Sequence, residues 1–235
     1  MSSAELQGGP GRSSSGSWVP MRSCHGSDRA QTWIERYVYG LVNQGLQDFV
    51  VSVGGAARWR AVRTAADVDA EMFVSGDIYP DAMTAQLVDA AGRVLDMPTT
   101  LLLRRFGKHW ILYTARRGYG AIFDTMGRTL VEFLTNLDMM HTRLSLGMPE
   151  LRPPSFVCEP FDDGRIRVEY RSDREGFAPM VIGLLEGLAE MYGLEVAVRH
   201  TAQRSPGRDH DEFVLEPMAA LSTPGPSERR SSCSV

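Results

Sequence analysis

The amino-acid sequence predicts an α+β fold, in which a helical N-terminal half is followed by a C-terminal half with an antiparallel sheet and one inserted helix. Up to about Leu146, apolar residues recur every three or four positions, as they do on one face of a helix. After Pro153 and Pro154 the apolar residues alternate with polar ones, as in a half-buried strand. Helices followed by strands are typical of α+β domains.

The composition indicates one folded domain and excludes several classes of protein. The chain has 235 residues, of which 43% are hydrophobic, which is enough for one well-packed core. A net charge of −4 argues against a nucleic-acid binder, because no cations are in excess to neutralise phosphates. No stretch approaches the ~18 apolar residues that a bilayer span needs. We therefore expect no contact with a membrane. The three cysteines are scattered and predict no disulfide framework, so we expect a cytoplasmic protein.

The two ends of the chain differ in composition from its centre. Residues 1–37 are rich in Ser and Gly, and residues 218–235 are rich in Ser and Pro. Such segments bury too little apolar surface to offset the entropy lost on ordering. We therefore expect a disordered N-terminal extension over 1–37, a folded unit over 38–217 and a disordered tail over 218–235.

The helical half contains several amphipathic stretches. The first begins at Gly40, and the second runs from Ala82 to Leu95 with Pro80 near its start. A third begins at Pro98, and Leu130 to Leu146 is the longest clear helix. The apolar face of the first stretch comprises Leu41, Val42, Gly45, Leu46, Phe49 and Val50.

The C-terminal half is predicted to hold a strand, a helix and a hairpin. The strand covers Ile166 to Arg174 and the helix covers about 177–192. Val196 and Val198, together with Phe213 to Leu215, predict a closing hairpin around the turn at Ser205-Pro206-Gly207.

One histidine lies on an apolar helix face. Leu130, Leu134, Leu137, His141 and Leu144 recur at spacings of four, three, four and three, so His141 is turned towards the core. Most histidines in such positions are packing residues whose ring nitrogen bonds to a carbonyl. A buried neutral imidazole is also what a haem iron requires as an axial ligand. Periodicity alone leaves both interpretations open.

The predicted strand places an arginine on its apolar side. Period two puts Tyr170, Ser172 and Arg174 on the same face as Ile166 and Val168. An inward arginine requires an anion nearby, because burying an unpaired charge is prohibitive. The alternative is a strand that ends at Tyr170 and leaves Arg174 in solvent. The donor cluster would suit a carboxylate or a phosphate, and a haem carries two propionates on one edge.

These residues resemble a known family. Tyr170-Arg-Ser-Asp-Arg174 matches the YxSxR propionate-binding signature of the haem-nitric oxide/oxygen binding (H-NOX) domains, which form the sensory domain of soluble guanylate cyclase. The similarity extends in order over about 38–217. Its other matching segments are Tyr39-Gly40-Leu41-Val42-Asn43, Tyr79-Pro80-Asp81, Phe106-Gly107, Gly118-Tyr119-Gly120, Phe133-Leu134, Asn136-Leu137-Asp138, His141, Arg152, Pro154-Ser155-Phe156, Asp209-His210 and Phe213.

The resemblance implies a haem b cofactor and gives each site residue a role. It makes His141 the proximal iron ligand, and it makes Tyr170, Ser172 and Arg174 the group that binds the propionates. Pro154 becomes the proline that presses on the macrocycle and distorts it. Residues 1–37 are extra, which implies an extension or a start site assigned too early. Residues 218–235 are too few for an output domain, so the chain is similar to the stand-alone bacterial type.

The pocket opposite His141 decides which gas the resemblance implies. Oxygen-binding members have a distal tyrosine on the helix after YxSxR, and alignment puts Met180, which has no donor, at that position. Trp110 has an indole N–H but is expected to fill core space. We therefore expect ferrous haem to bind nitric oxide and carbon monoxide rather than oxygen. The rest of the distal wall is expected to comprise Val42, Leu46, Thr114 and Leu184.

The family implies a sensor that performs no catalysis itself. Nitric oxide would weaken the iron–histidine bond, so that His141 is released and the haem relaxes. The expected readout is a separate signalling protein, such as a histidine kinase or a cyclic-di-nucleotide enzyme. Alternatives remain: an oxygen-binding or redox haem sensor, a peroxidase-type haem enzyme, a module whose Arg174 binds a nucleotide, and redox sensing through Cys158. His109, the only histidine near the distal segment, is expected to face solvent.

Overall fold

The structure is a computed structural model that describes residues 37–218. The predicted extension and tail therefore lie outside the described residues, except for Tyr37 and Met218. Tyr37 belongs to a short strand, and the backbone N–H of Met218 donates to the carbonyl oxygen of Glu195 at 2.9 Å. None of the helices between residues 37 and 218 has the length and apolar character needed to cross a membrane.

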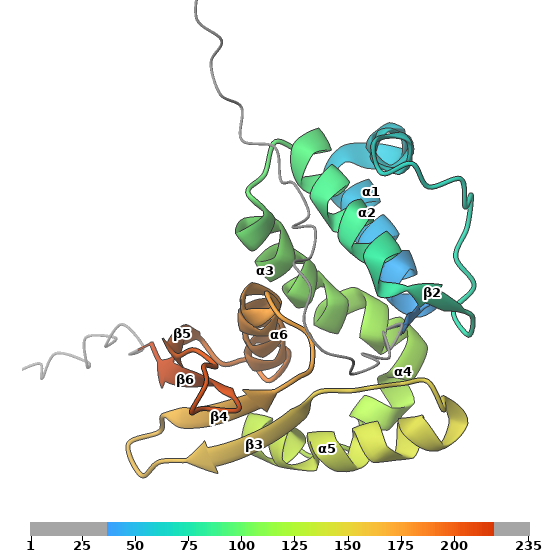
Figure 1. Cartoon of the computed structure of the whole chain (residues 1–235). Coiled ribbons are helices and arrows are strands. Elements are labelled where there is room, and N and C mark those ends of the chain that lie inside the picture. Colours follow the sequence, from blue (N-terminus) through green and yellow to red (C-terminus); the bar gives the residue numbers. More distant parts are fainter. Residues whose placement is uncertain (1–36, 219–235) are drawn as a thin grey trace, which may run out of the picture. The chain divides into compact units, whose positions relative to one another are not determined.

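The N-terminal half is helical, as the sequence predicts (Figure 1). Its elements are β1 (Tyr37–Tyr39), α1 (Gly40–Ala65), β2 (Ile78–Pro80), α2 (Asp81–Val94), α3 (Thr99–His109), the π-helix η1 (Trp110–Ala115), α4 (Arg116–Phe123) and α5 (Leu130–Gly147). The prolines that precede α2 and α3 mark the starts of both helices. The antiparallel pair β1–β2 and the π-helix have no counterpart in the predicted elements.

The helix α1 is longer than α5, which the sequence indicated as the longest. Its 26 residues are divided at Gly55, where φ is 78° and the backbone leaves the helical region. A left-handed φ of this kind is easily adopted by glycine alone. The single apolar face predicted from Gly40 therefore covers only the part of α1 that precedes this break, where Leu46, Phe49 and Val50 are buried.

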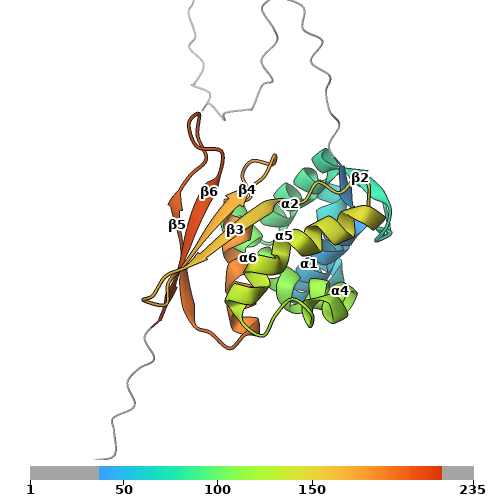
Figure 2. The same cartoon turned by 90° about the horizontal axis from the view of Figure 1, so that it is seen from below.

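The C-terminal half is a four-stranded antiparallel sheet with one helix inserted. Its elements are β3 (Ser155–Pro160), β4 (Ile166–Arg171), α6 (Ala178–Met191), β5 (Val196–Ala202) and β6 (Asp211–Pro217). The strand order is β3-β4-β6-β5, so the predicted hairpin β5–β6 and the predicted helix are confirmed. Figure 2 shows α5 and α6 beside one face of this sheet.

The strand β4 is shorter than the sequence predicts. It ends at Arg171, so Ser172 and Arg174 lie in the loop that leads to α6. Period two therefore does not explain why these two side chains meet Tyr170. The alternative, in which Arg174 lies in solvent, is also wrong, because the side chain of Arg174 is only 24% exposed.

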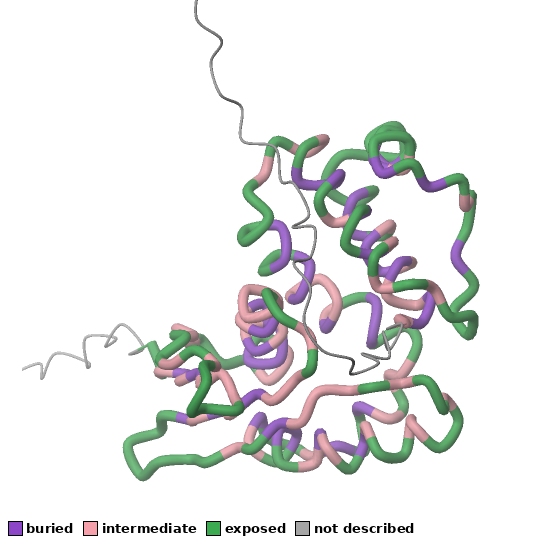
Figure 3. Tube along the Cα trace, viewed as in Figure 1, coloured by how far each residue is buried: buried purple, intermediate pink, exposed green. Residues whose placement is uncertain are grey.

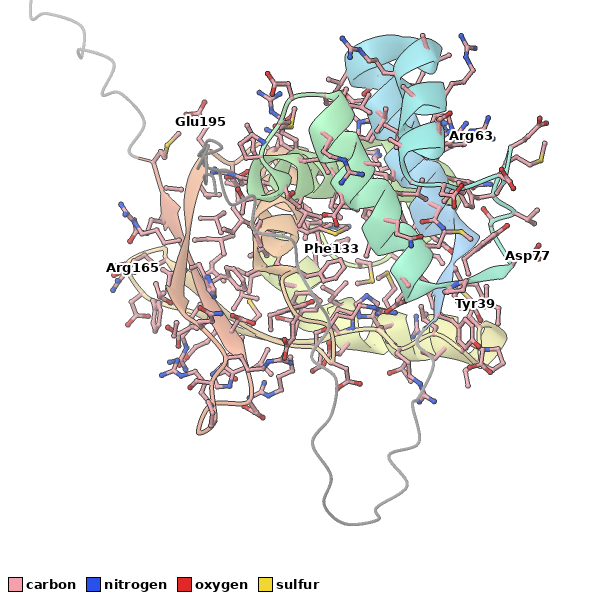
Figure 4. The ribbon with its side chains drawn as sticks, turned by 45° about the horizontal axis from the view of Figure 1, so that its top comes forward. Tyr39, Arg63, Asp77, Phe133, Arg165 and Glu195 are labelled. Carbon is pink, nitrogen blue, oxygen red and sulfur yellow. The ribbon has the colours of Figure 1, made fainter. Side chains whose placement is uncertain are left out.

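The buried residues form two clusters, and Figure 3 shows them spread over helices and sheet. The first joins α5 and α6 to the sheet, and Phe133, labelled near the centre of Figure 4, belongs to it. The second joins α1, α2 and α3. Trp110 of η1 packs against both clusters.

Two glycines allow α3 and α6 to pack closely. A Cβ at Gly183 would lie 1.8 Å from the carbonyl oxygen of Arg104, and one at Gly107 would lie 2.2 Å from that of Met180. Any side chain at either position would force the helices apart. This contact brings the first turn of α6, with Met180, against the end of α3 that leads into η1.

Candidate haem site

His141 lies on α5 at the edge of its buried face. Thr129 caps this helix, because its hydroxyl oxygen accepts the N–H of Glu132 at 3.2 Å. The buried face consists of Leu130, Phe133, Leu134, Leu137 and Met140, and it packs into the first cluster. His141 follows this face and is half-buried, with its ring 6.1 Å from that of Phe156.

The imidazole of His141 has a defined tautomer. Its Nδ1 lies 3.1 Å from the carbonyl oxygen of Pro154, and a carbonyl can only accept, so Nδ1 carries the proton. Burial lowers the pKa of His141, although the Pro154 carbonyl and the charge of Asp138 oppose that shift. The ring is therefore neutral at pH 7, and Nε2 holds its lone pair. An axial ligand of a metal requires this state of the ring.

Asp138 joins α5 to the start of β3. One oxygen of its carboxylate accepts the backbone N–H of Phe156 and the other accepts the hydroxyl of Ser155, both at 2.8 Å. These bonds fix the residues that directly follow Pro154. They also fix the carbonyl that orients His141. The sequence analysis gave Asp138 no role, although its position three residues before His141 places both on neighbouring parts of the helix surface.

Tyr170 and Ser172 stand at the end of β4. Tyr170 is 7% exposed, and its ring packs against Phe156 at 5.3 Å and against Phe213 at 6.4 Å. Burial raises the pKa of Tyr170, and a hydrogen bond with Ser172 opposes the rise. The Ser172 hydroxyl accepts the backbone N–H of Arg174 at 3.1 Å. The structure therefore brings the three residues of the YxSxR motif together.

Arg174 pairs with Asp81, a residue of α2 far away in the sequence. The guanidinium donates to both carboxylate oxygens of Asp81, at 2.8 and 3.2 Å. It also donates to the carbonyl oxygens of Tyr37 at 2.9 Å and Arg152 at 3.3 Å. The anion that the sequence requires near Arg174 is thus supplied by the protein itself. The sequence names Asp81 only within a segment that resembles the family, and its pairing with Arg174 was not predicted because no local pattern links positions 81 and 174.

The loop before β3 connects the two parts of the site. Arg174 contacts the carbonyl of Arg152, and His141 contacts the carbonyl of Pro154, two residues later. Pro154 therefore acts in this structure through its backbone, in contact with the predicted iron ligand. Its predicted pressure on the macrocycle stays a prediction.

The six predicted distal residues come from three helices. Val42 and Leu46 lie on α1, Trp110 and Thr114 on η1, and Met180 and Leu184 on α6. Gly45 permits the contact between α1 and η1, because a Cβ there would lie 2.9 Å from the Trp110 ring and 3.0 Å from Cγ2 of Thr114. Val42 and Met180 pack against the cluster that contains Leu46, and Leu184 packs against the other cluster. Trp110 touches both.

Thr114 is a buried polar residue among the predicted distal residues. It is 5% exposed, and its hydroxyl has no hydrogen-bond partner within residues 37–218. A threonine in an α-helix can bond to the carbonyl one turn earlier, whereas Thr114 lies in a π-helical turn. Such turns are frequent at functional sites, and an unsatisfied buried hydroxyl calls for an explanation.

Two other candidate residues take less reactive positions. His109 is half-buried rather than in solvent, with its ring 5.6 Å from Phe49 and 4.8 Å from Tyr113. Burial lowers its pKa, and its ring packs against those of Phe49 and Tyr113. Burial raises the pKa of the Cys158 thiol to about 11, which leaves it protonated at neutral pH.

The residues present fit a haem bound through one protein ligand. His141 offers a neutral imidazole with its Nδ1 fixed, and the YxSxR residues offer hydroxyl and guanidinium donors. No group of three or more His, Cys, Asp or Glu side chains that could hold a metal ion occurs among the residues described. The described residues therefore offer no set of protein ligands for a bare metal ion, whereas a haem iron requires only one histidine from the protein.

Comparisons with known proteins identify the family of the chain. The family model described as "Haem-NO-binding" matches residues 39–200. The chain belongs to the haem-NO-binding family. Among curated relatives, soluble guanylate cyclase gcy-33 of Caenorhabditis elegans is 27% identical over 172 residues, which are 73% of this chain and 18% of that protein. Soluble guanylate cyclase 89Da of Drosophila melanogaster is 27% identical over 160 residues, which are 68% of this chain and 24% of that protein.

Solved H-NOX structures share the fold. A mutant H-NOX protein from S. oneidensis in the Fe(II) state matches with a TM-score of 0.70 and 19% identity, over 77% of this chain and 96% of that one. An H-NOX protein from S. oneidensis in the Fe(II)NO state gives a TM-score of 0.68 with 19% identity, over 77% of this chain and 99% of that one. The α+β architecture predicted from the sequence is therefore the H-NOX fold. The chain spans about a fifth of the curated cyclases, which carry further segments.

Proposed function

We propose that this H-NOX domain binds one haem b through Nε2 of His141 and senses nitric oxide. The match of residues 39–200 to the haem-NO-binding family carries the proposal, and the 3.1 Å contact between His141 Nδ1 and the Pro154 carbonyl oxygen supports Nε2 as the coordinating atom. This contact leaves a neutral imidazole whose second nitrogen is free to coordinate. A carbonyl that accepts the other ring N–H raises the basicity of the coordinating nitrogen and fixes the ring.

The YxSxR residues are proposed to hold the propionates. Tyr170 and Ser172 offer hydroxyls. The guanidinium of Arg174 donates to the carbonyl oxygen of Arg152, in the loop before β3. Asp81 already pairs with Arg174. We therefore propose that Arg174 binds a propionate while it keeps its contact with Asp81. Pro154 is proposed to contact the macrocycle from the loop between these two groups.

Nitric oxide is the proposed ligand because the distal side is mainly apolar. Met180, Leu184, Val42 and Leu46 carry no hydrogen-bond donor, and bound oxygen needs one for stability. Carbon monoxide is expected to bind for the same reason as nitric oxide. When bound, a haem would supply ferrous iron as the site for the gas, and His141 would be the residue whose hold on that iron responds to the gas.

The protein's own contacts provide a route for the signal. A released His141 stays bonded to the Pro154 carbonyl, and Asp138 ties the next residues of the same loop to α5. A movement of the histidine is therefore shared between α5 and the start of β3. We propose that these contacts form a two-state element that the ligand biases.

The effector is proposed to be a separate protein, such as a histidine kinase or a cyclic-di-nucleotide enzyme. All elements within residues 37–218 belong to the H-NOX unit, and this unit is proposed to sense rather than catalyse. The chain is proposed to act in the cytoplasm, where the free Cys158 thiol would stay reduced.

A second candidate function is oxygen sensing, which one observation favours. The buried Thr114 hydroxyl has no partner in the described part of the chain, so it could donate to bound oxygen. Absorption spectra of the reduced protein in air, under nitric oxide and under carbon monoxide separate the two functions. The proposal expects nitric oxide and carbon monoxide complexes and no stable oxygen complex. An oxygen complex that disappears in Thr114→Val would establish the second function instead, and a pyridine haemochrome spectrum checks that the haem is haem b.

A further inference from the structure

A second arginine, Arg204, reaches the loop that carries Ser172 and Arg174. It lies between β5 and β6, outside the YxSxR motif. Its Nη1 donates to the backbone carbonyl of Ser172, and its Nη2 donates to Oε1 of Glu175 at 3.2 Å. The hairpin thus supports the motif loop from a distant part of the sequence.

The backbone of Arg204 is itself fixed to the sheet. Its N–H donates to Oδ1 of Asp211 at 3.3 Å, and the same oxygen contacts Nε2 of His200 at 2.8 Å. Asp211 is the residue of β6 that faces Tyr170 across the β4–β6 ladder. Arg204 is therefore anchored at the sheet position that also holds the first residue of the motif.

The charges around the motif leave Arg204 poorly neutralised. The charge of Arg174 is matched by Asp81, which it contacts through two hydrogen bonds. Among residues 37–218, the ion-pair partner of Arg204 is Glu175, whose side chain is 89% exposed, whereas that of Arg204 is 28% exposed. An exposed carboxylate is a weak partner because solvent screens it. Burial raises the pKa of Tyr170; the charge of Asp211 adds to that rise, and the charges of Arg174 and Arg204 oppose it.

We propose that Arg204 is a fourth member of the anion-binding group and a positioning residue for Ser172. It holds the Ser172 carbonyl, so that the serine hydroxyl and Arg174 stay in place. Asp81 already neutralises the charge of Arg174. Arg204 therefore adds a further positive charge for a ligand that carries two carboxylates. This inference rests on the proposed haem function.

The test compares haemin with its dimethyl ester, which has the same ring and no free carboxylates. The dissociation rate of each is measured from the full-length protein by transfer to excess apomyoglobin. The wild type is expected to hold haemin longer than the ester. Arg204→Gln is expected to reduce this preference about tenfold, the size of one lost hydrogen bond to a charged group. Arg204→Lys keeps the charge and is expected to recover most of the preference.

Two further variants make the test decisive. Arg199→Gln removes an arginine of the same hairpin that pairs with Glu216 and touches no motif residue, so it should leave the preference unchanged. Glu175→Gln, at an exposed position, removes the competing carboxylate and is expected to increase the preference. An equal preference in wild type, Arg204→Gln and Glu175→Gln would overturn the inference while leaving haem binding intact. A wild-type protein that acquires no Soret band with haemin would defeat the proposed function itself.

Discussion

The imidazole Nδ1 of His141 lies 3.1 Å from the carbonyl oxygen of Pro154, which ties α5 to the loop before β3. The same loop is tied to the YxSxR motif through Arg174 and to α5 again through Asp138. His141, Asp138 and Arg174 therefore all contact the short segment 152–156.

Asp138→Ala is expected to destabilise the protein by about 1–3 kcal/mol, because a buried backbone N–H at Phe156 and the Ser155 hydroxyl lose their acceptor. Urea unfolding followed by circular dichroism measures the change. The haem is also expected to dissociate faster, because the Pro154 carbonyl no longer holds His141 firmly. Glu150→Ala, an exposed change in the preceding loop, is the control. Equal haem dissociation in both variants would show that Asp138 does not position the ligand.

Asp81→Asn is expected to cost the haem-free protein about 1–2 kcal/mol, since Arg174 loses its charged partner but keeps two carbonyl acceptors. Addition of haemin is expected to restore most of the lost stability, because its carboxylates can accept hydrogen bonds from the Arg174 guanidinium. Urea unfolding with and without haemin measures both effects. Asp89→Asn, exposed on the same helix, serves as the control. A loss that haemin does not reduce would argue against a propionate at Arg174.

Gly45→Ala is expected to destabilise the protein by about 1–3 kcal/mol, because its Cβ would meet the Trp110 ring at 2.9 Å. The shift of Trp110 should also alter carbon monoxide binding, if this ring borders the gas pocket. Gly118→Ala adds a methyl group where no atom lies within 4 Å, and it is expected to be neutral. Thermal unfolding and carbon monoxide titration measure the two effects. The pocket assignment fails if Gly45→Ala leaves carbon monoxide binding unchanged.

Cys158 is expected to react slowly with iodoacetamide. Burial raises the pKa of its thiol from 9.0 to about 11, so at pH 8 it holds about 100-fold less thiolate than a free cysteine. Because the folded pKa is the higher one, this burial contributes stability below pH 9 that is lost as the pH rises towards 11. Peptide mass mapping of the alkylated protein measures the rate at Cys158 alone. A rate equal to that of a model thiol would revive the redox-sensing alternative.

The sequence predicts the fold class well because the longest elements have strong periodicity. The predicted helix from Leu130 to Leu146 differs from α5 by one residue, and the hairpin and α6 are also found. The strand β3 escaped prediction because it follows two prolines and buries only Phe156. The π-helix η1 has the same apolar pattern as the helices around it, so no sequence signal separates it.

The candidate site could be predicted only where the residues are local to a motif. Helix periodicity turns His141 towards the core and the strand pattern does the same for Tyr170, whereas their roles at a haem come from the family resemblance and stay predictions. Asp81 and Arg204 reach the motif from α2 and from the β5–β6 hairpin, and such long-range pairings depend on tertiary packing. The strand argument for Arg174 was wrong in its geometry, since β4 ends at Arg171, although its demand for a nearby anion was correct.

The most direct test of the haem proposal is the pigment of His141→Gly. The purified wild-type protein, loaded with haemin and reduced, should show a Soret band that shifts on addition of nitric oxide. In His141→Gly the band should be lost or strongly altered, and free imidazole should restore it, because the ligand is then supplied in solution. His210→Gln, which changes a histidine bonded to the exposed Asp209, should behave as wild type. An unchanged Soret band and unchanged nitric oxide response in His141→Gly would contradict the assignment of this histidine as the iron ligand.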